Sequence, residues 1–349
     1  MAKVLEHVTV YKQPTRFGGW PANNGIWQYV NADKTSEIVV GFTLGFTDYG
    51  RLSGHPIYRH NQQPAQARSL DGGRTWEIEE NPHTNPDGRP IPACTGDITF
   101  TQKDFALKFL RTGEHAGNVS WFWISYDRCH QWYGPYAFPM LGLTGIAART
   151  DYQVYGPNDC LVFMTAPKAD GYEGRAFCAR TRDGGRSFQF VSWIGPVFNG
   201  WSIMPSSVRL PSGRLIVALR CRYGPIDQGI QVFASDDEGV TWSFLSEPAG
   251  PYDSGNPPAM IRLADGRIAL TYGQRLAPFG MRARISEDDG ATWNEEIVLR
   301  DDAGTGDLGY PRTIQRPDGK ILTIYYYNDP PEKEGTITDR YIAATIWEA

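Results

Sequence analysis

The sequence predicts an all-β fold, a six-bladed β-propeller built from four-stranded antiparallel blades. The stretch SLDGGRTW at 69–76 recurs four more times, and its Asp stands at positions 71, 127, 183, 237 and 288. The repeats are 51 to 56 residues apart, which is typical of a blade of four short strands. Aromatic residues make up 13% of the chain, and its 38 Gly and 25 Pro favour many short strands and turns.

A second repeated pattern lies between these stretches and predicts the strands themselves. LPSGRLIVAL, LADGRIALTY and RPDGKILTIY each place a turn before an alternating run rich in β-branched residues, with Gly213, Gly266 and Gly319 in the turns. The 349 residues leave room for six blades, so we expect one domain over residues 1–349. The last blade is expected to be closed by an N-terminal strand near 4–11 and a C-terminal strand near 340–347, which leaves no open sheet edge.

The recurring stretch is predicted to be a structural turn. Five copies cannot form five copies of one active site. Asp and Ser or Thr side chains bond turn backbone, Gly permits positive φ, and the terminal Trp or Phe packs between sheets. A calcium loop is the competing interpretation, but no copy is followed by the distant Glu that such a loop requires.

This S-x-D-x-G-x-T-W pattern resembles the Asp box, or BNR repeat, of the sialidase (neuraminidase) superfamily and its bacterial glycosidase members. The resemblance extends over the whole chain. It implies a six-bladed propeller and an exo-glycoside hydrolase that acts on a terminal acidic sugar, sialic acid or a related one. Asp-box propellers also occur as lectins, lyases and assembly factors, so the resemblance specifies the fold more closely than the activity.

Composition argues against several other classes of protein. The net charge of −5 is spread along the chain without a basic block, so nucleic acid is not an expected partner. The five Cys are scattered without CxxC spacing, and we expect neither a disulfide framework, nor a metal site, nor a cofactor. No apolar run approaches the length of a membrane span, and the first residues lack a signal-peptide pattern. We therefore expect a cytoplasmic protein, or a secreted one if a leader has been removed, with its oligomeric state open.

Chemistry is expected where the innermost strand of each blade begins. A Pro marks several of these starts, and the residue before it is Trp20, Met204, Pro257 or Tyr310. The resemblance implies that Tyr310 is the nucleophile. A neutral phenol suits an anomeric carbon that carries a carboxylate, which would repel an attacking carboxylate. The structural alternative is a packed Tyr with its hydroxyl paired.

The resemblance also implies three Arg residues that hold the substrate carboxylate, since Arg offers planar bidentate hydrogen bonds. Arg220 matches one of them, with Arg222 as its substitute. Arg275 is the second candidate, with Arg282 as its rival. Arg16 is the third, although Gly rather than Arg stands two residues before the Pro in this sequence. The alternative for each is a surface salt bridge.

Two departures from the family pattern concern the catalytic carboxylates. Met204 stands where the family places the Glu that assists the nucleophilic Tyr. Asp307, three residues before Tyr310, is our candidate substitute, with Asp97 and Asp253 as further possibilities. The stretch before the first Asp box, RHNQQPAQARS, also lacks the expected acid/base Asp.

The candidates for the missing acid/base are Asp48, His55 and His60, because His can transfer protons at neutral pH. His55 is also a candidate for substrate binding, and Trp20 could stack against a sugar ring. In the run Tyr325–Tyr327 successive side chains alternate between faces, so only some point inward.

Two other functions stay open. A polysaccharide lyase would use a Tyr or His to remove the proton next to a uronate carboxylate, which suits the group His55, Tyr58 and His60. A binding or assembly propeller would carry out no chemistry, and the two departures favour it. The group of Tyr and Arg residues at the strand starts favours an enzyme.

Overall fold

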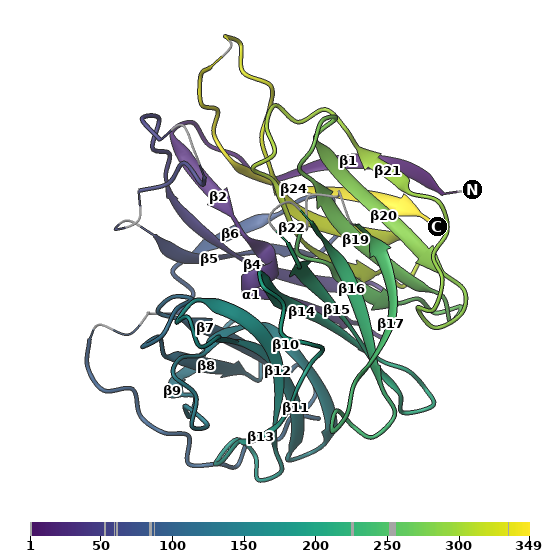
Figure 1. Ribbon diagram of the computed structural model, residues 1–349. Coiled ribbons are helices and arrows are strands. Elements are labelled where there is room, and N and C mark those ends of the chain that lie inside the picture. Colours follow the sequence, from purple (N-terminus) through teal and green to yellow (C-terminus); the bar gives the residue numbers. More distant parts are fainter. Residues whose placement is uncertain are drawn as a thin grey trace. The chain divides into compact units, whose positions relative to one another are not determined.

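The protein is an all-β six-bladed propeller with four-stranded antiparallel blades, as the sequence predicts (Figure 1). The computed structural model describes residues 2–51, 54–58, 60, 62–83, 86, 88–224, 227–250, 256–333 and 335–349. These residues form six sheets and one short helix, α1 (Pro21–Asn24). In the described part of the chain no helix has the length and apolar character needed to cross a membrane.

The chain divides into two compact units, which are described separately. Unit 1 comprises residues 1–84, 261–287 and 293–349, and unit 2 comprises 85–260 and 288–292. Each unit is assembled from segments distant in sequence. The expectation of a single domain over 1–349 stays a prediction.

Unit 1 holds three of the sheets, apart from the first residues of β18. The first contains β2 (Arg16–Gly19), β3 (Ile26–Val30), β4 (Ser36–Phe46), β5 (Gln63–Ser69) and β6 (Glu77–Glu80). The second contains β18 (Ala259–Arg262), β19 (Ile268–Gln274), β20 (Gly280–Ser286) and β21 (Ile297–Arg300). The third has the order β1-β24-β23-β22, with β1 (Lys3–Tyr11), β22 (Gly309–Gln315), β23 (Ile321–Tyr327) and β24 (Tyr341–Glu348).

Unit 2 holds the other three sheets, each in sequence order. They contain β7 (Ala106–Arg111), β8 (Ser120–Ser125) and β9 (Tyr133–Ala137); then β10 (Ala147–Gly156), β11 (Asp159–Pro167), β12 (Glu173–Thr181) and β13 (Gln189–Trp193); and β14 (Trp201–Arg209), β15 (Leu215–Arg222), β16 (Gln228–Ser235) and β17 (Ser243–Ala249).

The two ends of the chain share one sheet, as predicted. β1 pairs antiparallel with β24, and His7 lies opposite Thr345 in the register. Figure 1 shows the purple N-terminal strand beside the yellow C-terminal one. The N-terminal strand therefore supplies the outer strand of a sheet whose other three strands come from the end of the sequence.

The Asp box is a hydrogen-bonded turn, which confirms the structural interpretation. Asp71 Oδ1 accepts hydrogen bonds from the Thr75 amide (2.9 Å) and the Ser69 hydroxyl (2.9 Å), and Asp71 Oδ2 accepts one from the Thr75 hydroxyl (2.7 Å). The indole of Trp76 donates to the Gly73 carbonyl at 3.0 Å. The Asp of each later box likewise accepts a backbone N–H four residues on, at Gln131, Ser187, Thr241 and Thr292.

Three residues that each precede a Pro share a backbone distortion. Trp20, Met204 and Tyr310 all have positive φ, at 60°, 56° and 50°, although none is Gly and each precedes a Pro. The register of β14 and of β22 shifts at Met204 and at Tyr310. Such conformations are uncommon for non-Gly residues and gather at functional sites. Met204 lies within β14 and Tyr310 near the start of β22, whereas Trp20 follows β2 and precedes helix α1, so the strand start predicted at Trp20 is wrong.

A lysine is buried in the core of unit 2. Lys108 on β7 has no exposed surface, and its Nζ has no hydrogen-bond partner among the described residues. The Trp132 ring lies 5.9 Å from this Nζ. Burial lowers the pKa of Lys108 to about 7, with a smaller opposing effect from Cys129. The core of unit 2 thus contains an amine that folding drives toward its neutral form.

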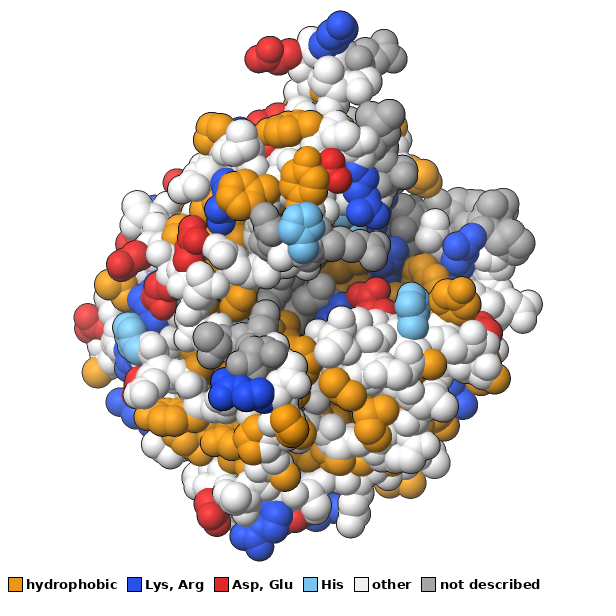
Figure 2. Space-filling model, turned by 90° about the vertical axis from the view of Figure 1, so that its left-hand side faces the viewer, with side chains coloured by type: hydrophobic (Ala, Val, Ile, Leu, Met, Phe, Trp, Pro, Cys, Tyr) orange, Lys and Arg blue, Asp and Glu red, His pale blue; other side chains and the backbone are white. Residues whose placement is uncertain are grey.

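The surface carries charges of both signs. In the face drawn in Figure 2, Lys and Arg side chains are interspersed with Asp and Glu, and no extended basic area is seen. The absence of a nucleic-acid partner stays a prediction.

Candidate active site in unit 1

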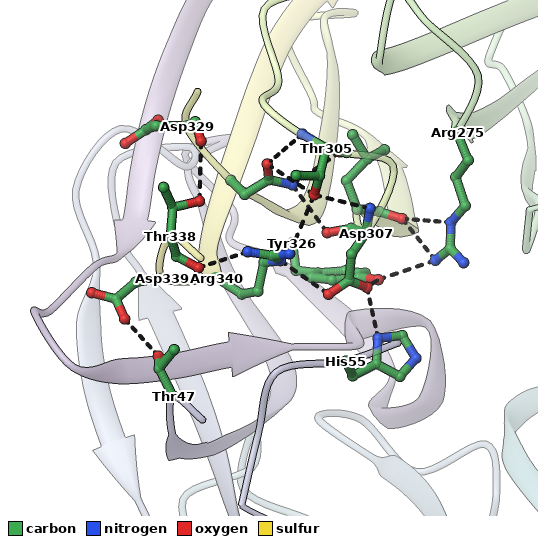
Figure 3. Close-up of polar contacts among 12 residues, drawn as sticks. Thr47, His55, Arg275, Thr305, Asp307, Tyr326, Asp329, Thr338, Asp339 and Arg340 are labelled. Carbon is green, nitrogen blue, oxygen red and sulfur yellow. Dashed lines mark hydrogen bonds and ion pairs between the residues drawn. The ribbon is translucent and has the colours of Figure 1, made fainter. Parts of the chain in front are cut away.

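A buried carboxylate, Asp307, is the centre of the candidate site. It lies in the loop between β21 and β22, and its side chain is 12% exposed. Its Oδ1 accepts hydrogen bonds from His55 Nδ1 and from the Tyr326 hydroxyl, both at 2.6 Å, and its Oδ2 accepts one from Arg340 Nε at 2.9 Å. Figure 3 shows these three side chains pointing toward the carboxylate. We call Asp307, His55, Tyr326, Arg340, Arg275 and Tyr310 the Asp307 cluster.

The surroundings of Asp307 keep it ionised. Burial alone would raise its pKa, but the hydrogen bond and charge of His55 and the charges of Arg340 and Arg275 outweigh burial. The net effect is a pKa for Asp307 well below its ordinary value. Arg340 is itself fixed by the Thr338 carbonyl (2.6 Å) and the Thr305 hydroxyl (3.2 Å). Asp307 is therefore a negatively charged hydrogen-bond acceptor that is held in a fixed position beside His55.

Arg275 follows β19 and joins the cluster from a second sheet. Its guanidinium donates to the Leu308 carbonyl (2.9 Å from Nη2) and to the Tyr326 hydroxyl (3.0 Å), and it lies 5.4 Å from the Tyr310 ring centroid. Burial would lower the pKa of Arg275, but Tyr326, Tyr310 and Asp307 outweigh burial and raise it. The guanidinium therefore stays positive beside two phenols.

The two phenols have different roles in the cluster. Tyr326, on β23, is fully buried, and burial together with the charge of Asp307 raises its pKa well above the usual value. It therefore stays protonated and donates to Asp307. Tyr310 is only half-buried, and its ring centroid lies 5.7 Å from that of Tyr326. Tyr310 is thus the phenol of the pair that a ligand can approach.

His55 presents its ring between two aromatic residues. Its ring centroid lies 6.2 Å from that of Tyr310 and 5.0 Å from that of Trp20, both edge-on. Its side chain is 35% exposed, and the hydrogen bond that its ring makes to the described residues is from Nδ1 to Asp307. With Nδ1 bonded to Asp307, Nε2 is the nitrogen left to exchange a proton with a ligand.

The backbone that places His55 is an extension of β4. Thr47 forms an isolated bridge with Ile57, and the Asp48 amide donates to the Pro56 carbonyl at 2.9 Å. The Thr47 hydroxyl donates to Asp339 at 2.5 Å, which ties this extension to the loop before β24. The same loop supplies Arg340, so one segment holds both His55 and Arg340.

The structure thus brings together five of the residues proposed from sequence: Tyr310, Asp307, His55, Arg275 and Trp20. For three others from unit 1, the contacts within the described part of the chain are with residues outside the cluster. Asp48 caps its own turn by accepting from the Gly50 amide at 3.1 Å. His60 is exposed and lies beside Tyr58. Arg16 lies over the Phe46 ring, at 4.7 Å from its centroid.

Arg282 has a different environment from the one its proposed role requires. It is 3% exposed and donates to Glu296 (3.1 Å) and to the carbonyl of Arg300 (2.7 Å). These bonds connect β20 with β21. The Arg282 guanidinium is therefore already occupied within the sheet.

The remaining candidates belong to unit 2 or lie outside the described residues. Arg220, on β15, lies over the Trp201 ring at 4.7 Å from its centroid. Met204 is buried on β14. Asp97 has positive φ, at 70°. Asp253 lies outside the described residues. Their proposed roles stay predictions.

Sequence reasoning missed Tyr326 and Arg340 as members of the site. Successive side chains in Tyr325–Tyr327 alternate between the two faces of the strand, but this pattern does not show which of the three rings reaches the site. Arg340 precedes the last strand, and nothing in the sequence marks it as a partner of Asp307. Among the described residues no group of three or more His, Cys, Asp or Glu side chains is arranged to hold a metal ion.

Comparisons with known proteins support the fold. The family description "BNR repeat-like domain" matches residues 162–323. A protein of unknown function from Dyadobacter fermentans is 23% identical, with a TM-score of 0.76 and 99% of both chains covered. A sequence comparison with curated proteins finds no match.

Two glycosidases share the fold at low identity. A variant of the α-L-arabinofuranosidase from Fusarium graminearum, in complex with an iminosugar inhibitor, is 13% identical, with a TM-score of 0.62 and coverage of 95% of this chain and 96% of the other. A Trypanosoma rangeli sialidase, in complex with 2,3-difluorosialic acid as a covalent intermediate, is 13% identical with a TM-score of 0.63. Here 98% of this chain is covered but only 59% of the sialidase, so the chain spans little more than half of that protein. Residues 162–323 match the BNR repeat-like domain, and the chain as a whole is a six-bladed propeller that shares its fold with these glycosidases.

Proposed function

We propose that this protein is an exo-glycoside hydrolase that removes a terminal acidic sugar, sialic acid or a related one. The observation that carries the proposal is the juxtaposition of Tyr310, His55 and Asp307 beside the Arg275 guanidinium. Tyr310 is the attacking residue, His55 transfers protons, and Asp307 holds the His55 ring in place.

The cluster favours a phenol over a carboxylate as nucleophile. Asp307 is the one carboxylate in the cluster, and it already accepts hydrogen bonds from His55, Tyr326 and Arg340. Paired-carboxylate hydrolysis would need a second, free carboxylate within about 5–10 Å. A phenol next to Arg275 instead has a positive charge to stabilise its anion as the proton leaves.

The reaction then proceeds in two balanced steps. In the first, the Tyr310 oxygen bonds to the anomeric carbon as the glycosidic bond breaks; His55 accepts the phenolic proton, and the leaving oxygen, on the opposite face of that carbon, takes a proton from solvent. In the second, water attacks the anomeric carbon and gives a proton to solvent, the bond to Tyr310 breaks, and His55 returns its proton to the Tyr310 oxygen. His55 and the solvent each end the cycle with the protons that they began with.

The test is hydrolysis of fluorogenic sialosides and other aryl glycosides by wild-type protein and by Tyr310→Phe, with Tyr133→Phe as a matched control on an exposed Tyr of unit 2. We expect release of the fluorophore by wild type, a loss of at least about 100-fold in Tyr310→Phe, and no loss in the control. Equal turnover by wild type and Tyr310→Phe would refute the role of Tyr310, and no turnover of any acidic glycoside would refute the proposed substrate.

A second function is favoured by one observation, the His–Asp pair itself. In a lyase His55 would remove the proton next to a uronate carboxylate, and Tyr310 would protonate the leaving oxygen. The two reactions differ in product. Elimination creates a conjugated double bond that absorbs in the ultraviolet, whereas hydrolysis releases a saturated reducing sugar.

A further inference from the structure

The two partners of the His55–Asp307 hydrogen bond come from separate segments of unit 1. His55 belongs to residues 47–50 and 54–58, which follow β4 and which we call the His55 arm. Asp307 lies in the loop between β21 and β22. The bond is 2.6 Å long and joins positions 252 apart in sequence. Its length therefore depends on what each of the two segments is attached to.

Two adjacent residues of a third segment hold the two partners. Arg340 Nε donates to Asp307 Oδ2 at 2.9 Å. Asp339, the residue before Arg340, accepts hydrogen bonds at Oδ1 from two hydroxyls of the His55 arm, those of Thr47 (2.5 Å) and Tyr49 (2.7 Å). Figure 3 shows Thr47 beside Asp339, and Arg340 extending toward Asp307. One dipeptide thus contacts both the arm that carries the imidazole and the carboxylate that the imidazole meets.

The segment that bears this dipeptide is itself fixed within unit 1. Asp339 Oδ2 accepts from the amide of Thr15, in the loop between β1 and β2, at 2.9 Å. The Thr338 hydroxyl donates to the Asp329 carbonyl at 3.0 Å, and the Asp329 carboxylate pairs with Lys12 Nζ at 2.5 Å. The dipeptide can therefore act as a rigid connection between the His55 arm and the Asp307 loop.

We propose that Asp339 is a positioning residue for His55. Through Thr47 and Tyr49 it holds the His55 arm where the imidazole reaches the carboxylate that Arg340 fixes. The inference rests on the proposed function, in which His55 exchanges a proton with Tyr310. The hydrogen bonds of Asp339 go to the arm and to the Thr15 amide, so Asp339 acts on the reaction through the place of the imidazole. Misplacement of a catalytic group by about 1 Å can cost a factor of about 100 in rate.

The connection can be cut without removing much packing. The Tyr49 ring is 48% exposed, and Val has nearly the shape of Thr, so the double variant Thr47→Val/Tyr49→Phe removes two hydroxyls and little else. Asp339 is half-buried and keeps its bond to the Thr15 amide, and water can take the place of the lost hydroxyls. The double variant should fold, but its imidazole should no longer be held at one distance from Asp307.

The first measurement is made without substrate, by proton NMR. The imidazole proton on Nδ1 of His55 faces an ionised acceptor at 2.6 Å, which moves its resonance downfield of the amide region. The resonance is assigned by its absence in His55→Gln. Thr35→Val is the matched control, because it removes a hydroxyl that donates to Asp33 at 2.6 Å in the turn between β3 and β4. We expect the resonance in wild type and control, and its loss or upfield shift in the double variant.

The second measurement is steady-state hydrolysis of the aryl glycoside that wild type releases. Because the arm places a proton-transfer group, the double variant should lose about 10- to 100-fold in kcat while KM stays within about twofold of wild type. Thr35→Val should match wild type in both constants. A residue with a merely structural role would leave both the resonance and kcat of the folded fraction unchanged.

An unchanged His55 resonance in the double variant would overturn the inference, and so would its absence from wild type or an unchanged kcat. If the double variant does not fold, Tyr49→Phe alone provides the same comparison on an exposed ring, and an unchanged resonance there would also overturn the inference. Failure of the proposed function is recognised separately, by a wild type that shows the resonance and hydrolyses no acidic glycoside. The NMR comparison would then still decide whether Asp339 places His55.

Discussion

Replacing Lys108 by Met should stabilise the protein and remove a defined pH dependence of its stability. The pKa of Lys108 falls from its ordinary 10.5 to about 7 in the folded state, because burial penalises the ammonium. Its Nζ has no hydrogen-bond partner among the described residues. Met has nearly the same length and flexibility and needs no partner, so it can fill the space without carrying a charge.

The magnitude follows from the interval between the two pKa values. Below pH 7 the lysine is protonated in both states, and burying its charge costs on the order of 5 kcal/mol. Between pH 7 and 10.5 the unfolded chain holds a proton that the folded chain releases, so stability rises by about 1.4 kcal/mol per pH unit. Above pH 10.5 both states are neutral and the penalty is absent.

The assay is guanidinium denaturation followed by Trp fluorescence at pH 7.5 and 9.5, under reducing conditions. Between these two pH values wild type should gain about 3 kcal/mol more than Lys108→Met. Lys103→Met, at an exposed position in the same unit, should behave like wild type. Parallel pH dependences for wild type and Lys108→Met would contradict the lowered pKa, since they would mean that Lys108 is solvated or paired in the folded protein.

Two further predictions concern the carboxylates. Asp307→Asn replaces a carboxylate that accepts hydrogen bonds from three donors by a neutral amide, whose NH₂ must face one of those donors, and it leaves Arg340 without its counter-charge. We expect the unfolding free energy to fall by about 3–5 kcal/mol and turnover to fall as well. Unchanged stability in urea denaturation would contradict this expectation. Asp71→Ala removes the hydrogen bonds to Thr75 and should cost about 1–2 kcal/mol at pH 7. Burial would raise the pKa of Asp71, but these hydrogen bonds outweigh it and lower the pKa to about 2. The contribution of Asp71 is therefore present above its unfolded pKa near 4 and is lost as pH falls toward 2, so the gap between wild type and Asp71→Ala should close in acid melts.

The fold was predictable because its signals are local and repeated. Each Asp box fixes its turn through hydrogen bonds within a few residues, such as Asp71 with Thr75, and so appears as a short motif. The pairing of β1 with β24 was predictable from the number of repeats, because the chain has room for six blades and the last blade has to be closed by strands from both ends of the sequence.

The site was predictable only as separate residues. Tyr310, Asp307, His55, Arg275 and Trp20 could each be named, but the bond between Asp307 and His55 joins positions 252 apart in sequence. Asp307 was expected to assist Tyr310, whereas its hydrogen bonds go to His55, Tyr326 and Arg340. No pattern in one sequence records such pairings, because they depend on how loops from different sheets meet.

Buried charges were the least predictable feature. Arg282 and Lys108 both lie on alternating strands, where a charged residue is expected to face solvent. Arg282 donates hydrogen bonds to Glu296 and to backbone carbonyls, and burial lowers the pKa of Lys108 to about 7. Their environments are decided by neighbouring strands and turns, which the one-dimensional pattern does not specify.

If Tyr310 forms a bond to the sugar, a substrate analogue that reacts but is released slowly should trap that bond. The protein is incubated with 2,3-difluorosialic acid, the compound bound in the sialidase covalent intermediate, and digested for peptide mass mapping. We expect a glycosyl adduct on the peptide that contains Tyr310 and none in Tyr310→Phe. An adduct on a different residue, or no adduct at saturating reagent, would contradict it.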